Sequence, residues 1–177
     1  QCGSPRQIWG RSPQARTERQ ISKLFPESEI LKNPETFADD NVIILRDDVV
    51  YSDNFLSALP EWQDNLFIDS NDMPIGGHVT KDRLDKVSSW IIQQSDPPSL
   101  PRLTPDKVGT LYNDALRRRS VPYAILINKD TKKQTERRLY DESYKGVTDL
   151  VTKYVWPSPA YHVTRFCAKA GITPNMV

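Results

Sequence analysis

The chain has 177 residues, of which 24 are lysine or arginine and 23 are aspartate or glutamate, so its formal net charge is +1. This length suits one domain with or without an appendage, and the near-neutral charge excludes general affinity for nucleic acids. No run approaches the roughly 18 apolar residues that cross a bilayer, and we expect no secretory leader. Cys2 and Cys167 match no metal or redox spacing, which predicts free thiols in a reducing compartment.

The first half of the chain predicts alternating helices and strands. Ser12 followed by Pro13 is typical of a helix start, and we expect that helix over 13–25. Four consecutive apolar residues within 41–48 predict a strand that is buried on both faces, as in a parallel sheet. The following segments predict a short helix, two strands and an amphipathic helix over 53–62, 65–70, 74–79 and 81–94.

The second half begins with a proline-rich connector over 95–107, which is either a linker or, in our preferred interpretation, a rigid loop within one domain. A helix with a basic end is expected over 108–120, and a further buried strand over 123–128. From Thr131 onward the sequence predicts helices, over 132–144, 146–155 and 158–170. The alternation of strands and helices indicates an α/β sheet with crossover connections.

The segment 158–170 carries an apolar stripe flanked by cations. The stripe and its flanks consist of Ala160, Val163, Phe166, Cys167 and Ala170, with His162, Arg165 and Lys169 around them. Such a helix suits the cytoplasmic surface of a membrane, or it is an ordinary terminal helix docked on the domain. Gly171 is typical of a helix end and Thr173–Pro174 of a new helix start. We therefore expect that this chain is part of a longer protein.

Aspartates follow two of the predicted strands. Asp47 and Asp48 end the strand within 41–48, and Asp130 follows the strand over 123–128. Carboxylates at the carboxyl edge of an open α/β sheet stand where such folds bind ligands, and Mg²⁺ in a phosphate site takes one or two of them. One of the first two could therefore share a magnesium ion with Asp130. Alternatively, these residues cap a turn and the next helix.

The segment "IWGRSPQAR" is the one candidate for a phosphate-binding loop. It offers Gly10, Arg11 and Arg16 next to the expected helix start, whereas a phosphate cradle usually contains several glycines. A simple glycine turn is the alternative. The two histidines, His78 and His162, lie far apart in the sequence, which argues against histidine-based nucleophilic or zinc chemistry.

The last part of the chain resembles a known family. The stretch "RRLYDESYKGVTDLVTKYVWPSPAYHVTRFCAKAGITPNMV", about 40 residues, resembles the segment that leads into the first membrane helix of CDP-alcohol phosphatidyltransferase family proteins. The match consists of Lys145, Thr148–Asp149 and the "GITPN" motif of 171–175. The resemblance implies a helical juxtamembrane segment over 141–177 that leads to a transmembrane domain at the cytoplasmic face of the inner membrane.

The upstream part is similar to the sugar-nucleotidyltransferase-like domain that is fused to such enzymes, as in inositol-phosphate cytidylyltransferase fusions. The segment "IWGRSPQARTERQ" stands at the family's signature loop, and "VIILRDDVVYSD" at the strand with a metal-binding aspartate, here Asp48. The segment "INKDT" stands at a later acidic residue, here Asp130. This similarity implies a Rossmann-like, GT-A type three-layer α/β sandwich over residues 1–140.

Two functions follow from this resemblance. In the first, the domain joins CTP to a polyol phosphate, with Mg²⁺ on Asp48 and Asp130, nucleotide contacts from Gly10, Arg11 and Arg16, and Lys145 as a further catalytic residue that holds phosphate. In the second, the domain is a non-catalytic module that stabilises, dimerises or regulates the membrane enzyme. The glycine-rich loop is reduced here, and the aspartate array of the phosphatidyltransferases is absent from this chain. A third interpretation is an unrelated binding domain.

Overall fold

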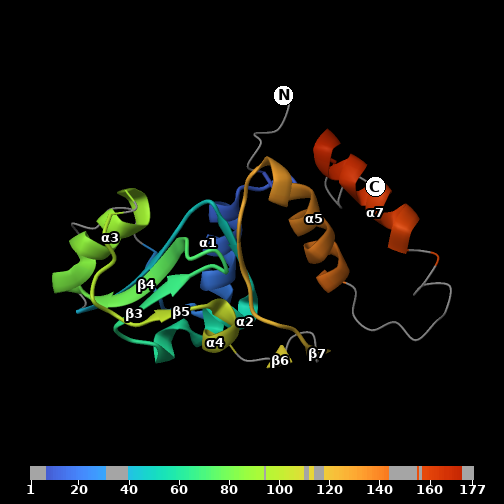
Figure 1. The fold of residues 1–177 in the computed structure, drawn as a ribbon. Coiled ribbons are helices and arrows are strands. Elements are labelled where there is room, and N and C mark those ends of the chain that lie inside the picture. Colours follow the sequence, from blue (N-terminus) through green and yellow to red (C-terminus); the bar gives the residue numbers. More distant parts are fainter. Residues whose placement is uncertain are drawn as a thin grey trace. The chain divides into compact units, whose positions relative to one another are not determined.

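The computed structural model describes residues 7–30, 40–93, 95–109, 112–113, 118–143, 155 and 157–172. These residues form a mixed α/β fold (Figure 1). They belong to two compact units: Gln14–Leu126 form the larger, and Gln1–Pro13 with Ile127–Val177 form the smaller. The expected domain boundary between residues 140 and 141 stays a prediction.

The helices of the larger unit follow the predicted pattern. They are α1 (Pro13–Leu24), α2 (Asp53–Ala58), which continues into the 3₁₀ turn η2 (Leu59–Glu61), α3 (Leu84–Gln93), which follows the 3₁₀ turn η3 (Lys81–Arg83), and α4 (Pro105–Val108). The helices predicted over 13–25, 53–62 and 81–94 are therefore confirmed. Ser52 caps α2, because its Oγ accepts a hydrogen bond from the Phe55 N–H at 3.4 Å.

The main sheet is mixed and has the order β1-β4-β3-β5. Its strands are β1 (Asn41–Leu45), β3 (Asn65–Ile68), β4 (Pro74–Thr80) and β5 (Arg102–Leu103). Strands β1 and β3 pair antiparallel with β4, and the short β5 runs parallel to β3. The expectation of a parallel β1 buried on both faces is wrong: β1 is an edge strand, and Ile43 is 38% exposed while its neighbour Val42 is buried.

Two further sheets have two strands each. Strand β2 (Val49–Tyr51) pairs antiparallel with β8 (Ala124–Leu126). The strand predicted over 123–128 therefore exists, but its three residues are half-buried and not buried as expected. Strands β6 (Tyr112–Asn113) and β7 (Arg118–Arg119) also pair antiparallel. The helix predicted over 108–120 is wrong at these positions, since Gly109 ends α4 in extended backbone and pairing between strands overrides the local helix propensity.

Helices cover both faces of the main sheet. On one face, Val87, Trp90 and Ile91 of α3 pack against Leu66 and Val79. On the other, α2 packs against β2 and β3 through a row of aromatic rings: the Phe55 ring lies 5.8 Å from that of Tyr51 and 5.5 Å from that of Phe67, centroid to centroid. Successive side chains of a strand point to opposite faces of the sheet. Leu66 and Ile68 of β3 are therefore buried on the α3 side, and Phe67 on the α2 side.

The smaller unit contains α5 (Lys129–Ser143), α7 (Pro157–Ala170) and a turn over 8–11. Helices predicted over 132–144 and 158–170 are confirmed, and almost all of the helix predicted over 146–155 lies outside the described residues. The cap of α5 is Asn128, whose Oδ1 accepts hydrogen bonds from the N–H groups of Asp130 and Thr131, while Thr131 Oγ1 accepts from the Asn128 N–H. Asp130 itself is exposed in the first turn.

The contacts of α7 distinguish its two sides. Tyr161 packs edge-on against the rings of Trp9 and Tyr140, and Arg165 lies 3.1 Å from the carboxylate of the buried Glu136. The predicted apolar stripe points elsewhere: Val163 is 62% and Phe166 68% exposed. The helix is therefore docked through Tyr161 and Arg165, not through its apolar stripe.

The C-terminal end of α7 is as the sequence predicts. Gly171 has a φ of 71°, and the Ile172 N–H donates to the Cys167 carbonyl at 2.9 Å, which closes the helix. The helix start predicted at Thr173–Pro174 lies outside the described residues. Within the described ranges, none of the helices has the length and apolar character needed to cross a bilayer.

The close approach of β1 to β4 predicts a strict requirement for glycine at position 76. A Cβ at position 76 would stand 2.6 Å from the Ile44 carbonyl oxygen. At Gly77 the two atoms nearest to an added Cβ belong to the side chains of Val87 and Leu66, at 3.2 and 3.4 Å. We expect Gly76→Ala to lower the free energy of unfolding by about 1–3 kcal/mol, and Gly77→Ala by clearly less. Urea unfolding of both variants measures the difference, and equal losses would contradict the expected backbone clash.

Candidate functional site

The predicted metal-binding aspartate lies in the turn between β1 and β2. Both carboxylate oxygens of Asp48 accept hydrogen bonds from the guanidinium of Arg46, from Nε at 2.8 Å and from Nη2 at 2.9 Å. The Asp48 side chain is only 16% exposed. This hydrogen bond, with the charge of Asp48, raises the pKa of Arg46. The carboxylate therefore already holds a bidentate cation from its own turn.

A buried hydroxyl, that of Tyr51, stabilises the same turn through hydrogen bonds to the backbone. Tyr51 donates its O–H to the Ile75 carbonyl at 2.7 Å and accepts a hydrogen bond from the Arg46 N–H at 3.0 Å. Arg46 in turn donates from Nη1 to the Ile91 carbonyl in the last turn of α3, at 3.3 Å. Complete burial raises the pKa of Tyr51, because the phenolate would lose its hydration.

A metal ion at Asp48 would compete with Arg46 for the same two oxygens. Asp130, the other predicted ligand, belongs to the smaller unit, so the shared magnesium site of Asp48 and Asp130 stays a prediction. Within the described ranges, no group of three or more histidine, cysteine, aspartate or glutamate side chains is arranged to hold a metal ion.

The predicted phosphate loop is a tight turn. Trp9 and Gly10 have φ angles of 51° and 77°, and Ile8 and Arg11 exchange backbone hydrogen bonds at 2.8 and 3.1 Å. This matches the glycine-turn alternative, in which two of the turn's N–H groups are already bonded. Arg16 lies in α1, with a buried Nε that has no hydrogen-bond partner among the described residues. A nucleotide role for Gly10, Arg11 and Arg16 stays a prediction, and Lys145 lies outside the described residues.

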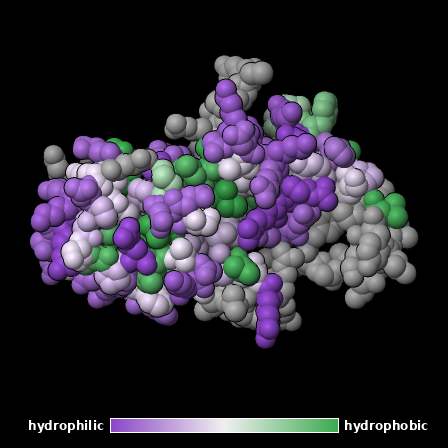
Figure 2. Space-filling view, in the orientation of Figure 1, coloured by the Kyte–Doolittle hydropathy of each residue, from purple (hydrophilic) through white to green (hydrophobic). Residues whose placement is uncertain are grey.

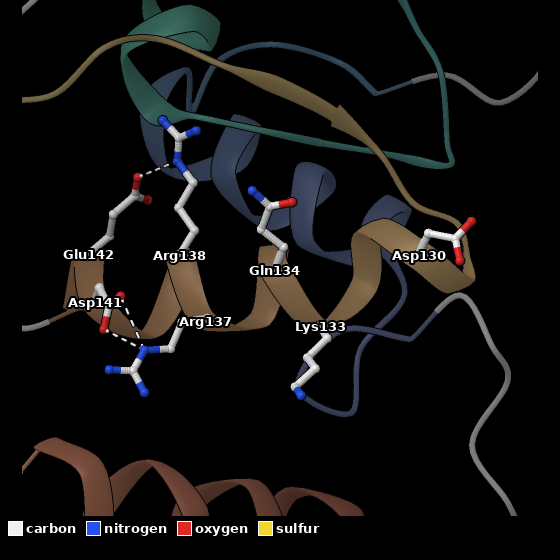
Figure 3. A pocket seen from close by; sticks show the side chains of 7 residues that line it. All are labelled: Asp130, Lys133, Gln134, Arg137, Arg138, Asp141 and Glu142. Atoms are coloured by element: carbon white, nitrogen blue, oxygen red, sulfur yellow. Dashed lines mark hydrogen bonds and ion pairs between the residues drawn. The ribbon is translucent and has the colours of Figure 1, made fainter.

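A shallow depression of about 600 Å³ lies on α5 (Figure 3). All its side chains come from this one helix, and Asp130 stands at the opposite end from Glu142. Arg137 pairs with Asp141 at 3.2 Å and Arg138 with Glu142 at 3.3 Å. Three acidic side chains thus balance three basic ones, and the helix surface is mainly hydrophilic in Figure 2. We interpret this surface as a solvated helix face.

A larger groove of about 950 Å³ lies within the larger unit, between α1, residues 25–30, β1 and η2. Its lining includes apolar side chains of α1 and β1, four carboxylates and the buried His78, whose Nδ1 lies 3.1 Å from the Leu59 carbonyl. The sequence did not predict this groove, because β1 was expected to be buried on both faces. The sequence carries no signal for it, because residues 42–45 are all apolar and only the fold distinguishes the buried Val42 from the exposed Ile43.

The comparisons with known proteins do not assign a family. No protein-family model and no curated protein matches the chain.

The buried phenol predicts a specific loss of stability at high pH. The pKa of Tyr51 is raised on folding, so its contribution is complete below the ordinary tyrosine pKa of about 10 and decreases as pH rises above it. We expect the difference in free energy of unfolding between the natural chain and Tyr51→Phe to shrink by up to about 1.4 kcal/mol per pH unit above pH ~10. Urea unfolding at several pH values measures it, and because other tyrosines cancel in this difference, a constant difference would contradict the prediction.

Proposed function

We propose that the chain is the membrane-facing, non-catalytic module of a CDP-alcohol phosphatidyltransferase family protein, on a Rossmann-like, GT-A nucleotidyltransferase-like scaffold. The observation that carries the proposal is the orientation of α7. The helix docks through Tyr161 and Arg165 and leaves Val163 and Phe166 exposed, immediately before the "GITPN" motif that resembles the entry to the family's first membrane helix.

The exposed stripe suits weak adsorption to a lipid surface. Burying a side chain such as valine or phenylalanine contributes about 1.5–3 kcal/mol, and a basic residue near an anionic surface about 1 kcal/mol. Lys169 is exposed beside the stripe, whereas Arg165 is engaged with Glu136. Such binding holds a free protein only reversibly, so that flotation detects it at high lipid concentration. It is sufficient to orient a domain that a transmembrane segment already holds at the membrane, because tethering raises the effective concentration.

The geometry around Asp48 favours a non-catalytic role over nucleotidyl transfer. The carboxylate that would hold Mg²⁺ is bound by Arg46, and the turn at Gly10 closes on its own backbone. A CTP–Mg²⁺ site would need free carboxylate oxygens for the metal and free N–H groups for the phosphates. Here the Asp48 oxygens and two N–H groups of the turn already have hydrogen-bond partners within the protein.

Vesicle flotation of the 177-residue chain tests the membrane-facing role. We expect Val163→Asp with Phe166→Asp to reduce binding to phosphatidylglycerol-containing vesicles about tenfold or more, since tenfold corresponds to about 1.4 kcal/mol, less than burial of one such side chain contributes. The control is Val121→Asp, an exposed valine of the larger unit. If the double variant floats like the natural chain, the stripe does not contact lipid and the proposal fails.

The second candidate function is a CTP:polyol-phosphate cytidylyltransferase, which the position of Asp48 in the turn between β1 and β2 favours. In that reaction a phosphate oxygen of the polyol phosphate attacks the α-phosphorus of CTP, and pyrophosphate leaves.

Calorimetric titration with CTP–Mg²⁺, together with an assay for pyrophosphate release from CTP and inositol phosphate, separates the two functions. A non-catalytic module gives no heat and no pyrophosphate. If heat is observed, Asp48→Asn should abolish it, while Asp47→Asn, in the exposed neighbour, should leave it unchanged. That pair of results would replace the scaffold role with the catalytic one.

A further inference from the structure

The outer edge of β1 carries backbone groups that no other described strand pairs. The Lys81 N–H donates to the Asp40 carbonyl and the Arg46 N–H to the Ile75 carbonyl, so the even-numbered residues of β1 face β4. The N–H and C=O groups of Asn41, Ile43 and Leu45 therefore point away from the sheet, where the strand order ends. An edge of this kind is a template for another strand.

The edge lacks the usual protection against pairing. Its sequence, "NVIIL", contains no lysine and no proline, the residues that commonly block edge strands. The side chains of Ile43 and Leu45 line the groove, as do those of Ile21 and Phe25. An added strand would thus gain backbone hydrogen bonds from β1 and apolar contacts from the groove, which is the recognition mode called β-augmentation.

A buried polar atom also points to an occupant. Thr17 lines the groove and is only 7% exposed, and its Oγ1 has no hydrogen-bond partner among the described residues. A buried hydroxyl without a partner is uncommon, and a polar group of a bound segment would satisfy it.

The charges of the groove select the kind of segment. Its lining contains four carboxylates, Glu18, Glu27, Glu29 and Asp47, against one cation, Arg46, which Asp48 already neutralises. We infer that the edge of β1 and this acidic groove bind an extended peptide segment of a partner protein, with a short apolar core flanked by basic residues. A second copy of β1 is disfavoured, because it would bring two acidic rims together.

The test uses the 177-residue chain and two synthetic peptides, acetyl-KRVIVRK-amide and acetyl-EDVIVDE-amide. We expect the basic peptide to bind with a dissociation constant below about 1 mM and to weaken with added salt, and the acidic peptide not to bind. Bound peptide should slow amide hydrogen exchange at Asn41, Ile43 and Leu45 more than at Val42 and Ile44, which already pair with β4.

Ile43→Pro removes one outward N–H without removing a hydrogen bond to β4, and proline is tolerated on edge strands. We expect at least tenfold weaker binding of the basic peptide. The double variant Glu27→Lys with Glu29→Lys should weaken binding of the basic peptide similarly. Because both positions lie outside the strands, this variant tests the proposal even if Ile43→Pro does not fold. Ile92→Thr, at an exposed position of α3, is the control that should leave binding unchanged.

Several outcomes would overturn the inference. Protection of the three outward amides in the free monomer would mean that the chain covers its own edge. A dimer that Ile43→Pro converts to monomer would mean that a second copy is the occupant. Equal binding of both peptides, or no binding of the basic peptide, would remove the proposed partner.

Discussion

The buried hydroxyl of Tyr51 is the interaction on which the larger unit depends. Tyr51 belongs to β2, yet its O–H bonds to Ile75 of β4 and to the backbone of Arg46 after β1. The residue therefore joins the two-stranded sheet to the main sheet, and its ring stacks on Phe55 of α2. Because the hydroxyl is fully buried, losing these partners would leave a polar group unsatisfied, which favours the observed conformation of the turn that carries Asp48.

The smaller unit is organised by a different constraint. Glu136 of α5 is buried, and a buried carboxylate requires a partner, which Arg165 of α7 supplies at 3.1 Å. The aromatic contacts of Tyr161 lie on the same side of α7. These polar and aromatic contacts determine which face of the helix docks, and they leave the apolar stripe outward. Ordinary burial of the stripe would have given the opposite orientation.

Much of the fold could be predicted where the signal is local. The start of α1 at Pro13 and the end of α7 at Gly171 each depend on a single residue with a particular backbone preference. Both were predicted from the sequence. The apolar run of β1 was correctly predicted as a strand, but its neighbours were not, because a run of four apolar residues does not distinguish a central strand from an edge strand beside a groove. The pairing of β6 with β7 was missed for another reason: residues 108–120 favour a helix by local propensity, and pairing between strands overrides it.

The candidate site was also only partly predictable, because the sequence identifies an acidic residue but not whether its oxygens are available to a ligand. Asp48 lies in the turn three residues after the end of β1, but a carboxylate's availability depends on its partner, and Arg46 lies only two residues away. A cation so close in the sequence reaches the carboxylate within the same turn and at little entropic cost, so the acidic pair "DD" has to be interpreted together with the arginine that precedes it. The useful unit is therefore "RDD", in which one charge is already neutralised and only Asp47 remains exposed beside the groove. That exposed acid adds to the negative lining of the groove, so the same three residues that weaken a metal site strengthen a site for a basic partner.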